Sequence, residues 1–440
     1  MFLYAEQASP RLLYVIDFLN KEMFQDDLAF TNDIQQYLSA ALPKLNYSDR
    51  KIADDEFHIV PSGLLFETDI RNQEVTCFGW DTMIAFFPVT YASIPFDILS
   101  AIFYLISRYE EYLPHELDAY GRYAHTNSLA YKEGFLDQPL VNNWILKWEK
   151  ILRELYPNIL LRHRTFKFIP TYDIDIMYAY KGKSWWVNAA GFCRSLLKGD
   201  SDAAFQRLRV LQNEEKDPYD AYEWLDALHL YCRSQPVYFF LVAQQQHGYD
   251  KNLPTETPGF RDLIKYSAEA YKVGIHPSWQ SSVAPDTRLL KEELEWLEAV
   301  ADVPVSRSRH HYIKFMLPQH YERLLAHNIM HDYSMGYGSI NGFRASTCST
   351  FNWFNLAKNE AIELLIYPFC FMDANAYFEQ KLTPAQAYAE LKQYYYAVQK
   401  VQGCLITIWH NNILGTAAEF EGWRDLYEIF MKEDIFWDAG

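Results

Sequence analysis

The chain has 440 residues, of which half are hydrophobic and 22% are charged, a composition typical of folded globular proteins. This length is large for one compact core, so we expect two domains. The formal net charge of −17 argues against nucleic acid as a partner, because phosphate backbones bind basic surfaces. No apolar stretch reaches the roughly 20 residues that a membrane-spanning helix needs. The first residues lack the pattern of a signal peptide, so the cytoplasm is the expected location.

The first part of the chain mixes strand and helix patterns. The segments "EFHIVPSGLLFE" and "EVTCFGW" predict strands, and "FDILSAIFYLISRYEEYL" predicts a buried helix. Residues 141–155 carry apolar side chains at the spacing of an amphipathic helix, which Pro157 should end. We therefore place a domain boundary near residue 160. Residues 1–160 are expected to form a smaller mixed α/β accessory domain, in which no motif indicates a chemistry.

Residues 161–440 alternate strand and helix patterns. The helical patterns cover residues 259–271, 287–300 and 384–401. Alternation of this kind predicts a parallel sheet with crossover helices, and seven strands are about enough to close a TIM-like (β/α) barrel. The seven strand candidates are "FKFIPTY", "PVYFFLV", "KVGIH", "VPVS", "NIMHDY", "ELLIYPF" and "CLITIWH".

Polar side chains follow each of these strand candidates. In α/β barrels the chemistry lies at the carboxyl ends of the strands, so these residues are expected to meet at one rim. The pair Asp173 and Asp175 follows the first strand and raises the question of why two acids stand there. The other rim candidates, in chain order, are Asp250, His276, the segment Arg307 to His311, Asp332, Asp373 and His410.

Four segments of the second part together resemble the motifs of the polysaccharide deacetylases. They are the D-x-D pair in "DID", the arginine segment "GFRASTCSTF", the aspartate and aromatic segment "MHDYSMGY", and the closing "LITIWHNN". These carbohydrate esterases are built on a distorted seven-stranded (β/α) barrel. The resemblance covers about residues 166–440, and the order of the motifs along the chain is more specific than any single motif. Bacterial proteins with a poorly characterised N-terminal domain ahead of such a barrel are similar.

The resemblance implies a role for each matching residue. Asp173 would be the general base, and Asp175 and His276 would bind a divalent metal, expected to be zinc. Arg344 would orient the base, and Asp332 would hold the catalytic histidine. That histidine is His410, which would protonate the leaving amine.

The sequence departs from the family pattern at the metal site. The family places a second histidine four residues after the first, whereas this chain has Gln280 there. A replacement ligand is expected from His310, from His311 or from water. The H-x-x-x-H pair at His327 and His331 is rejected as a metal site, because the strand-like "NIMHDY" indicates that the helix has already ended.

These assignments predict a metal-dependent hydrolase that removes an acyl group from an N-acylated sugar or polysaccharide precursor. A divalent metal lowers the pKa of water, an adjacent carboxylate accepts the proton, and an imidazolium protonates the leaving amine. The first alternative is a carbohydrate-binding or scaffolding protein without catalysis, which the missing second histidine favours. The second is a glycosidase that uses the two acids without metal, although acids two residues apart in a strand lie on one face.

Simpler interpretations accompany each candidate. The aspartate pair could cap a strand end, His276 could be a buried hydrogen-bonded histidine, and His410 could belong to the core. The loop "KGKSWW" at residues 181–186 could bind a charged sugar or lie at a membrane interface. We expect instead a solvated loop with a buried tryptophan.

Overall fold

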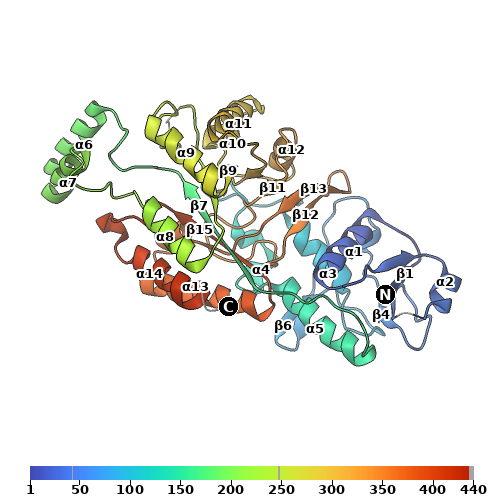
Figure 1. Ribbon diagram of the computed structural model, residues 1–440. Coiled ribbons are helices and arrows are strands. Elements are labelled where there is room, and N and C mark those ends of the chain that lie inside the picture. Colours follow the sequence, from blue (N-terminus) through green and yellow to red (C-terminus); the bar gives the residue numbers. More distant parts are fainter. Residues whose placement is uncertain (42, 246–247, 436–440) are drawn as a thin grey trace.

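The computed structural model describes residues 1–41, 43–245 and 248–435 and has a mixed α/β fold (Figure 1). Its first part contains a parallel four-stranded sheet with the order β2-β1-β3-β4. The strands are β1 (Phe2–Ala5), β2 (Ala29–Thr31), β3 (Lys44–Tyr47) and β4 (Phe57–Ile59), and a separate antiparallel hairpin joins β5 (Cys77–Trp80) to β6 (Met83–Phe86). The helices are α1 (Pro10–Glu22), α2 (Ile34–Ser39), α3 (Ile98–Ile106), α4 (Leu129–Lys132) and α5 (Leu140–Leu155).

Local sequence explains where these helices begin and what they bury. Helix α1 starts after Ser9, whose side chain accepts a hydrogen bond from the backbone of Leu12, and Pro10 occupies the first turn. Every residue of α3 is buried, as its continuous apolar run predicts. Helix α5 ends at Leu155, two residues before Pro157, which confirms the helix predicted over residues 141–155.

The second part is organised around a nine-stranded sheet with the order β12-β13-β11-β10-β9-β8-β7-β15-β14. Every pairing is parallel except that of β12 with β13. The strands are β7 (Lys167–Ile174), β8 (Val237–Phe240), β9 (Lys272–Ile275), β10 (Arg307–Ser308), β11 (His331–Asp332), β12 (Phe351–Asn355), β13 (Glu360–Ile366), β14 (Phe371–Met372) and β15 (Cys404–His410).

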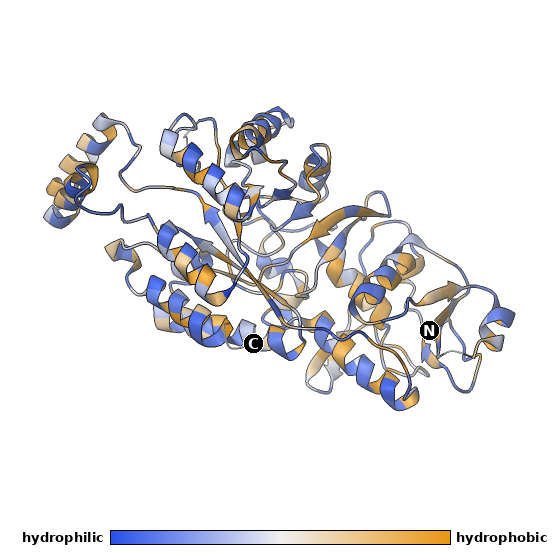
Figure 2. Cartoon of the chain, viewed as in Figure 1, coloured by the Kyte–Doolittle hydropathy of each residue, from blue (hydrophilic) through white to orange (hydrophobic). Residues whose placement is uncertain are grey.

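Helices connect most of these parallel strands. They are α6 (Trp185–Leu197), α7 (Ser201–Leu211), α8 (Tyr222–Cys232), α9 (Pro258–Ala270), α10 (Trp279–Val283), α11 (Arg288–Ala301), α12 (Gln319–Leu325), α13 (Pro384–Lys400) and α14 (Trp423–Ile429). The long helices α9, α11 and α13 lie where the sequence predicts them. Figure 2 shows orange, hydrophobic central strands beneath helices of alternating colour, which is the pattern of a sheet covered by amphipathic helices.

The predicted parallel sheet is confirmed, with three differences. The fourth strand is β10 rather than the preceding "VPVS", and β12 and β14 were not predicted. Both additional strands are edges, and β14 has two residues, too few to leave a pattern in the sequence. The described residues show no pairing between the edges β12 and β14, so backbone hydrogen bonds do not close this sheet into a ring.

Strand register brings the predicted rim residues to one edge. In the pairing of β15 with β7, His410 lies opposite Asp173. Phe240 of β8 lies opposite Ile174 of β7 and Ile275 of β9, so Asp175 and His276 leave the two strands that flank β8 at the same level. The carboxyl ends of these parallel strands therefore deliver their acids and imidazoles together.

The N-terminal part packs directly against the large sheet. Phe24 forms a β-bridge with Leu161, and the Tyr14 hydroxyl donates a hydrogen bond to the Asn352 carbonyl in β12. A buried ion pair joins Glu111 to Arg344. In the part of the chain that the structure describes, no helix combines the length and the apolar character needed to cross a membrane.

Candidate active site

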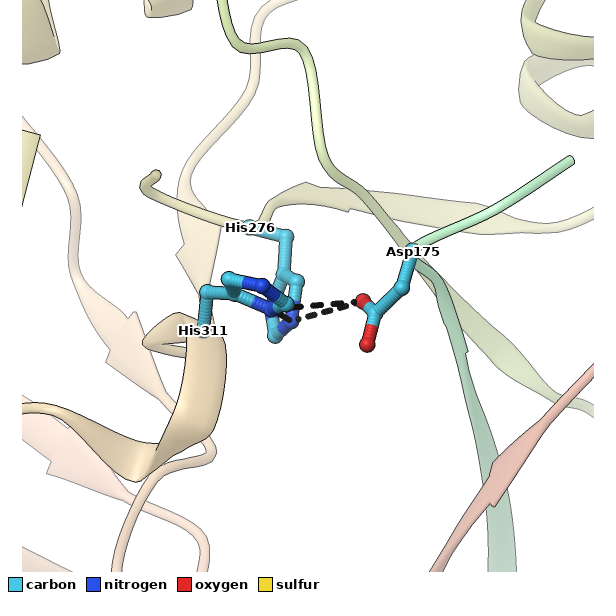
Figure 3. Close-up of side chains that lie close together, drawn as sticks. All are labelled: Asp175, His276 and His311. Atoms are coloured by element: carbon cyan, nitrogen blue, oxygen red, sulfur yellow. Dashed lines mark hydrogen bonds and ion pairs between the residues drawn. The ribbon is translucent and has the colours of Figure 1, made fainter. Parts of the chain in front are cut away.

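Three side chains that follow the ends of three parallel strands meet at the rim (Figure 3). Asp175 follows β7, His276 follows β9, and His311 follows β10 by three residues. Nε2 of His276 lies 3.1 Å from Asp175 Oδ1, and Nδ1 of His311 lies 3.4 Å from the same oxygen. The two imidazole nitrogens are themselves 3.1 Å apart. One ligand atom from each residue thus lies within 4.8 Å of the others, a separation suited to one metal ion.

The far side of each imidazole fixes which nitrogen faces the cluster. Nδ1 of His276 lies 2.5 Å from the Arg309 carbonyl, and Nε2 of His311 lies 3.3 Å from the Tyr249 carbonyl. A carbonyl only accepts, so these nitrogens carry the protons. In the neutral rings the opposite nitrogens then present lone pairs toward Asp175. This outward hydrogen bonding is the usual support of histidines that bind metal.

A cation fits the centre of this cluster. Asp175 Oδ1 is buried and has no hydrogen-bond donor of acceptable geometry among the described residues, despite the two nearby nitrogens. Burial would raise the pKa of Asp175, but His311 and His276 hold it well below its usual range. Burial would likewise lower the pKa of His311, yet Asp175 raises it. The donor set of two imidazoles and one carboxylate is one that binds zinc, with a position left for water or substrate.

Asp173 lies beside the cluster and is held by a different residue. It is buried, and its Oδ1 accepts a 2.8 Å hydrogen bond from NH1 of Arg309. The other oxygen, Oδ2, lies 3.8 Å from Nε2 of His276. Arg309 is fully buried, donates from Nε to the Tyr333 carbonyl, and stacks 4.5 Å from the centre of the Phe239 ring. One oxygen of Asp173 is therefore fixed, and the other faces the cluster.

His410 approaches the cluster from the end of β15. Its Nδ1 lies 2.6 Å from Asp373 Oδ1, and its backbone N–H donates to the second oxygen of that carboxylate. Nε2 lies 3.5 Å from Asp175 Oδ2. Burial alone would lower the pKa of His410, but the charge of Asp373, with help from Asp175, raises it to about 10. The ring is therefore oriented by one carboxylate and can carry a proton toward another.

A cavity of about 330 Å³ opens over these groups. Asp173, Asp175, His276, His311 and His410 all line it. Its wall is aromatic on one side, where Tyr249 and Tyr312 lie 5.0 Å apart between ring centres, and Tyr120 of the N-terminal part packs 5.6 Å from Tyr312. Flat aromatic faces beside polar groups suit sugar rings.

The turn that carries His311 is held by the N-terminal part of the chain. Tyr312 and Ile313 have φ values of 56° and 53°, a left-handed conformation that costs free energy in residues other than glycine. NH1 of Arg122 donates a 2.7 Å hydrogen bond to the Tyr312 carbonyl. Nζ of Lys314 donates to the carbonyls of Tyr120, at 2.8 Å, and Gly121. These three bonds stabilise a strained turn directly after one of the three clustered residues.

Arg344 does not orient Asp173, which corrects the expectation from the resemblance. Its Nε and NH2 donate to both oxygens of Glu111 at 2.8 and 2.6 Å, and its guanidinium stacks on Phe315. Arg309 occupies the position beside Asp173 instead. Arg344 lies in a segment that packs on the N-terminal part, where Glu111 is the nearest carboxylate for this buried cation to pair with.

Asp332 does not hold His410, which is a second correction. Its carboxylate accepts hydrogen bonds from Ser308, Tyr321 and Ser334. Strand β11, which contains Asp332, lies on the far side of β10 from the cluster, whereas β14 pairs directly with β15. Asp373 follows β14 and is therefore the acid that reaches His410.

The expected alternatives for the missing second histidine are now distinguished. Gln280 donates to the Gln245 carbonyl and does not join the cluster. His310 turns toward Ser282, while its neighbour His311 faces Asp175. His327 lies beyond the end of α12, so the rejected H-x-x-x-H pair shares no helical face.

Arg309 and Asp373 are the functional candidates to which sequence reasoning gave no role. Both stood among the rim residues, but no motif of the resemblance contained them. Asp373 reaches His410 because β14 lies beside β15, and Arg309 reaches Asp173 from β10, which is three places from β7 in the sheet. Only this arrangement of the strands could have assigned Arg309 to Asp173 and Asp373 to His410.

Glu293 of α11, which contacts the turn after His276, should make the free energy of unfolding depend on pH. The side chain is fully buried, and burial raises its pKa to about 7 despite a hydrogen bond from the Ser278 backbone. A raised pKa means that the native state holds the proton of Glu293 more tightly than the unfolded chain does. The stability that this proton contributes is fully present below about pH 4.5 and is lost as pH rises through 7. From about pH 5 to pH 8, wild type should lose about 2 to 3 kcal/mol of unfolding free energy relative to Glu293→Gln.

Urea denaturation at several pH values measures this difference. Glu292→Gln, at the exposed neighbouring position, is the control and should follow the wild-type profile. If wild type and Glu293→Gln show parallel profiles, the carboxyl group of Glu293 is already ionised in the native state.

Comparisons with known proteins include one family model, which matches the first part of the chain. A family of unknown function, DUF7033, matches residues 1–157. None of the curated proteins matches the chain. Solved structures similar to it include a putative polysaccharide deacetylase from Mycobacterium smegmatis, with 14% identity, a TM-score of 0.39 and coverage of 62% of this chain and 86% of the other.

Two further structures give similar values. A polysaccharide deacetylase from Bacillus cereus has 11% identity and a TM-score of 0.31, with coverage of 61% of this chain and 88% of the other. An allantoinase has 9% identity and a TM-score of 0.38, with coverage of 62% and 89%.

Proposed function

We propose that this protein is a metal-dependent hydrolase that removes the acyl group from an N-acylated sugar or polysaccharide precursor. One observation carries the proposal: Asp175, His276 and His311 turn one ligand atom each toward a common centre, with Asp173 and His410 beside it. The outward hydrogen bonds of both imidazoles support this interpretation. The three residues would hold a divalent ion, expected to be zinc, which supplies a Lewis acid and lowers the pKa of water.

The remaining residues divide the proton transfers. Asp173 Oδ2, the oxygen that Arg309 leaves free, is placed to accept the proton of the attacking water. Nε2 of His410 is placed to give a proton to the nitrogen as the carbon–nitrogen bond breaks, so that hydrolysis yields a carboxylic acid and an amine. Asp373 holds the ring of His410 in the required orientation. The aromatic wall at Tyr249 and Tyr312 would stack on the sugar.

We infer a distorted (β/α)7 barrel over residues 161–440, preceded by an accessory α/β domain in residues 1–160. Cytoplasmic location also stays a prediction. The alternative of a carbohydrate-binding protein without catalysis depended on Gln280, and His311 removes that argument because it supplies a second imidazole from another strand.

Acetate release from N-acetylglucosamine oligomers tests the function. Protein treated with a chelator should be inactive and should recover activity with Zn²⁺ or Co²⁺. Asp173→Asn should lower release by about 10²- to 10⁴-fold, the usual contribution of a general base, while it binds Zn²⁺ within about threefold of wild type. Asp262→Asn, an exposed acid on α9, is the control and should retain full activity.

Two results would count against this function. Metal-independent release would indicate hydrolysis by the acids alone. Tight metal binding without release from any N-acylated sugar would instead favour the binding protein.

A further inference from the structure

Helices α6 and α7 form a hairpin that stands away from the rest of the molecule (Figure 1). Two extended segments connect it to the body, and it lies at the opposite end from the N-terminal sheet. The helices pack on each other, with Phe192 against Phe205 and NH1 of Arg207 donating to Asn188. The candidate active site uses no residue of this hairpin.

One face of α6 is apolar and exposed. Trp185 is 81% exposed, Trp186 62% and Leu197 89%. The expectation of a buried tryptophan in "KGKSWW" is therefore wrong, because both tryptophans begin a helix whose outer face no element among the described residues covers. The exposed apolar positions of α6 recur at helical spacing, and they are Trp185, Trp186, Ala189, Ala190, Cys193, Leu196 and Leu197.

Helix α7 extends this surface. Phe205, Leu208 and Leu211 lie three residues apart and are 52%, 38% and 41% exposed. Figure 2 shows orange turns on both helices of the hairpin. Exposed apolar side chains that gather on one element, rather than lying singly, mark a surface that binds something.

The charge of the hairpin is opposite to that of the whole chain. Residues 181–211 contain six basic side chains and two acidic ones, in a protein of net charge −17. Arg194 and Lys198 are exposed next to the apolar positions Cys193 and Leu197. A basic patch beside exposed tryptophan and leucine is the composition of elements that lie in the surface of a membrane.

We propose that the hairpin α6–α7 binds the surface of an anionic lipid bilayer. Its tryptophans and leucines would enter the boundary between headgroups and acyl chains, and its basic side chains would contact the lipid phosphates. The acidic body would be repelled by the same surface, so the projecting hairpin is the part that can approach it. The site would hold the protein at a membrane without a spanning helix.

A second copy of the chain is a less suitable occupant. Face-to-face docking of two identical hairpins would bring two basic patches together, and like charges destabilise such a contact. Docking of the hairpin on the acidic body of another copy would close only if both copies docked reciprocally, and otherwise it would build rings or filaments. Charge complementarity therefore favours lipid.

Vesicle sedimentation of the full chain tests the proposal. Vesicles of phosphatidylcholine with phosphatidylglycerol should bind the protein, and vesicles of phosphatidylcholine alone should bind it at least about tenfold more weakly. Leu197→Glu should lower binding to the anionic vesicles by at least about tenfold, because it places a negative charge in the apolar face. Leu230→Glu is the matched control, since Leu230 is 83% exposed on α8, and it should bind like wild type.

A fluorescent probe on Cys193 provides a second measurement. Cys193 is exposed in the apolar face, whereas the other five cysteines are buried or half-buried. An environment-sensitive probe there should shift to the blue with anionic vesicles, and salt above about 0.5 M should weaken the shift by screening. Equal binding of Leu197→Glu and Leu230→Glu would overturn the proposal. Self-association that Leu197→Glu abolishes, without vesicle binding, would overturn it in favour of a second copy.

Discussion

Replacement of Asp175 by asparagine is expected to weaken Zn²⁺ or Co²⁺ binding by more than about 100-fold. Loss of a residue that merely supports a metal ligand costs about 10- to 100-fold, and both imidazoles of the cluster approach Asp175 directly. The amide has the same size but no charge, so it cannot offset the charge of the cation. Calorimetric titration measures the affinity, and the visible absorption of Co²⁺ reports its coordination.

Two companion variants make this result specific. His311→Asn should also lose metal binding, because His311 supplies the second imidazole of the cluster, which the glutamine at position 280 cannot supply. Gln280→Ala should bind metal like wild type, since its side chain points to the Gln245 carbonyl. Circular dichroism checks that each variant is folded. Binding by Asp175→Asn within about threefold of wild type would show that the cluster is not the metal site.

Replacement of Glu111 by glutamine is expected to lower the free energy of unfolding by about 3 to 5 kcal/mol at neutral pH. Glu111 accepts hydrogen bonds from Arg344 and Arg108, and all three side chains are at most 2% exposed. The variant leaves the buried guanidinium of Arg344 without a counter-charge, and it leaves Arg108 with Glu110 alone, at 3.5 Å. Urea denaturation measures the loss.

The pH dependence of this loss identifies its cause. Burial would raise the pKa of Glu111, but Arg344 and Arg108 lower it to about 2. A lowered pKa contributes stability above about pH 4.5 that disappears as pH falls toward 2, so wild type and variant should converge in acid. Glu116→Gln, at an exposed position nearby, should change stability by less than about 0.5 kcal/mol. A loss below about 1 kcal/mol for Glu111→Gln would mean that the arginines find other partners.

Patterns of hydrophobic residues predicted the strands of the large sheet better than they predicted its order. The "FKFIPTY" and "CLITIWH" segments are long apolar runs, and both became strands. Strand β14 has two residues and leaves no period in the sequence. Its place beside β15 follows from tertiary packing, and this place decides that Asp373, rather than Asp332, supports His410.

The same limit explains the errors at individual charged residues. A D-x-D pair after a strand fixes the position of Asp173 and Asp175, because backbone geometry alone brings them to the rim. The partner of a buried arginine depends on which distant segment packs against it. Glu111 lies 233 residues before Arg344 in the chain, and nothing local in either segment indicates the other. Likewise, His311 rather than the residue at position 280 joins the cluster because β10 lies beside β9, and the sequence does not show this adjacency.

Three hydrogen bonds with the N-terminal part hold the turn that carries His311. Arg122 donates to the Tyr312 carbonyl, and the carbonyls of Tyr120 and Gly121 accept from the side chain of Lys314. The position of one proposed ligand therefore depends on a segment outside the large sheet. Thermodynamic linkage is reciprocal, so an ion that needs His311 in place also favours the docked N-terminal segment. A truncated C-terminal fragment is therefore a poor substitute for the whole chain, and metal affinity becomes a gauge of whether the two parts are assembled.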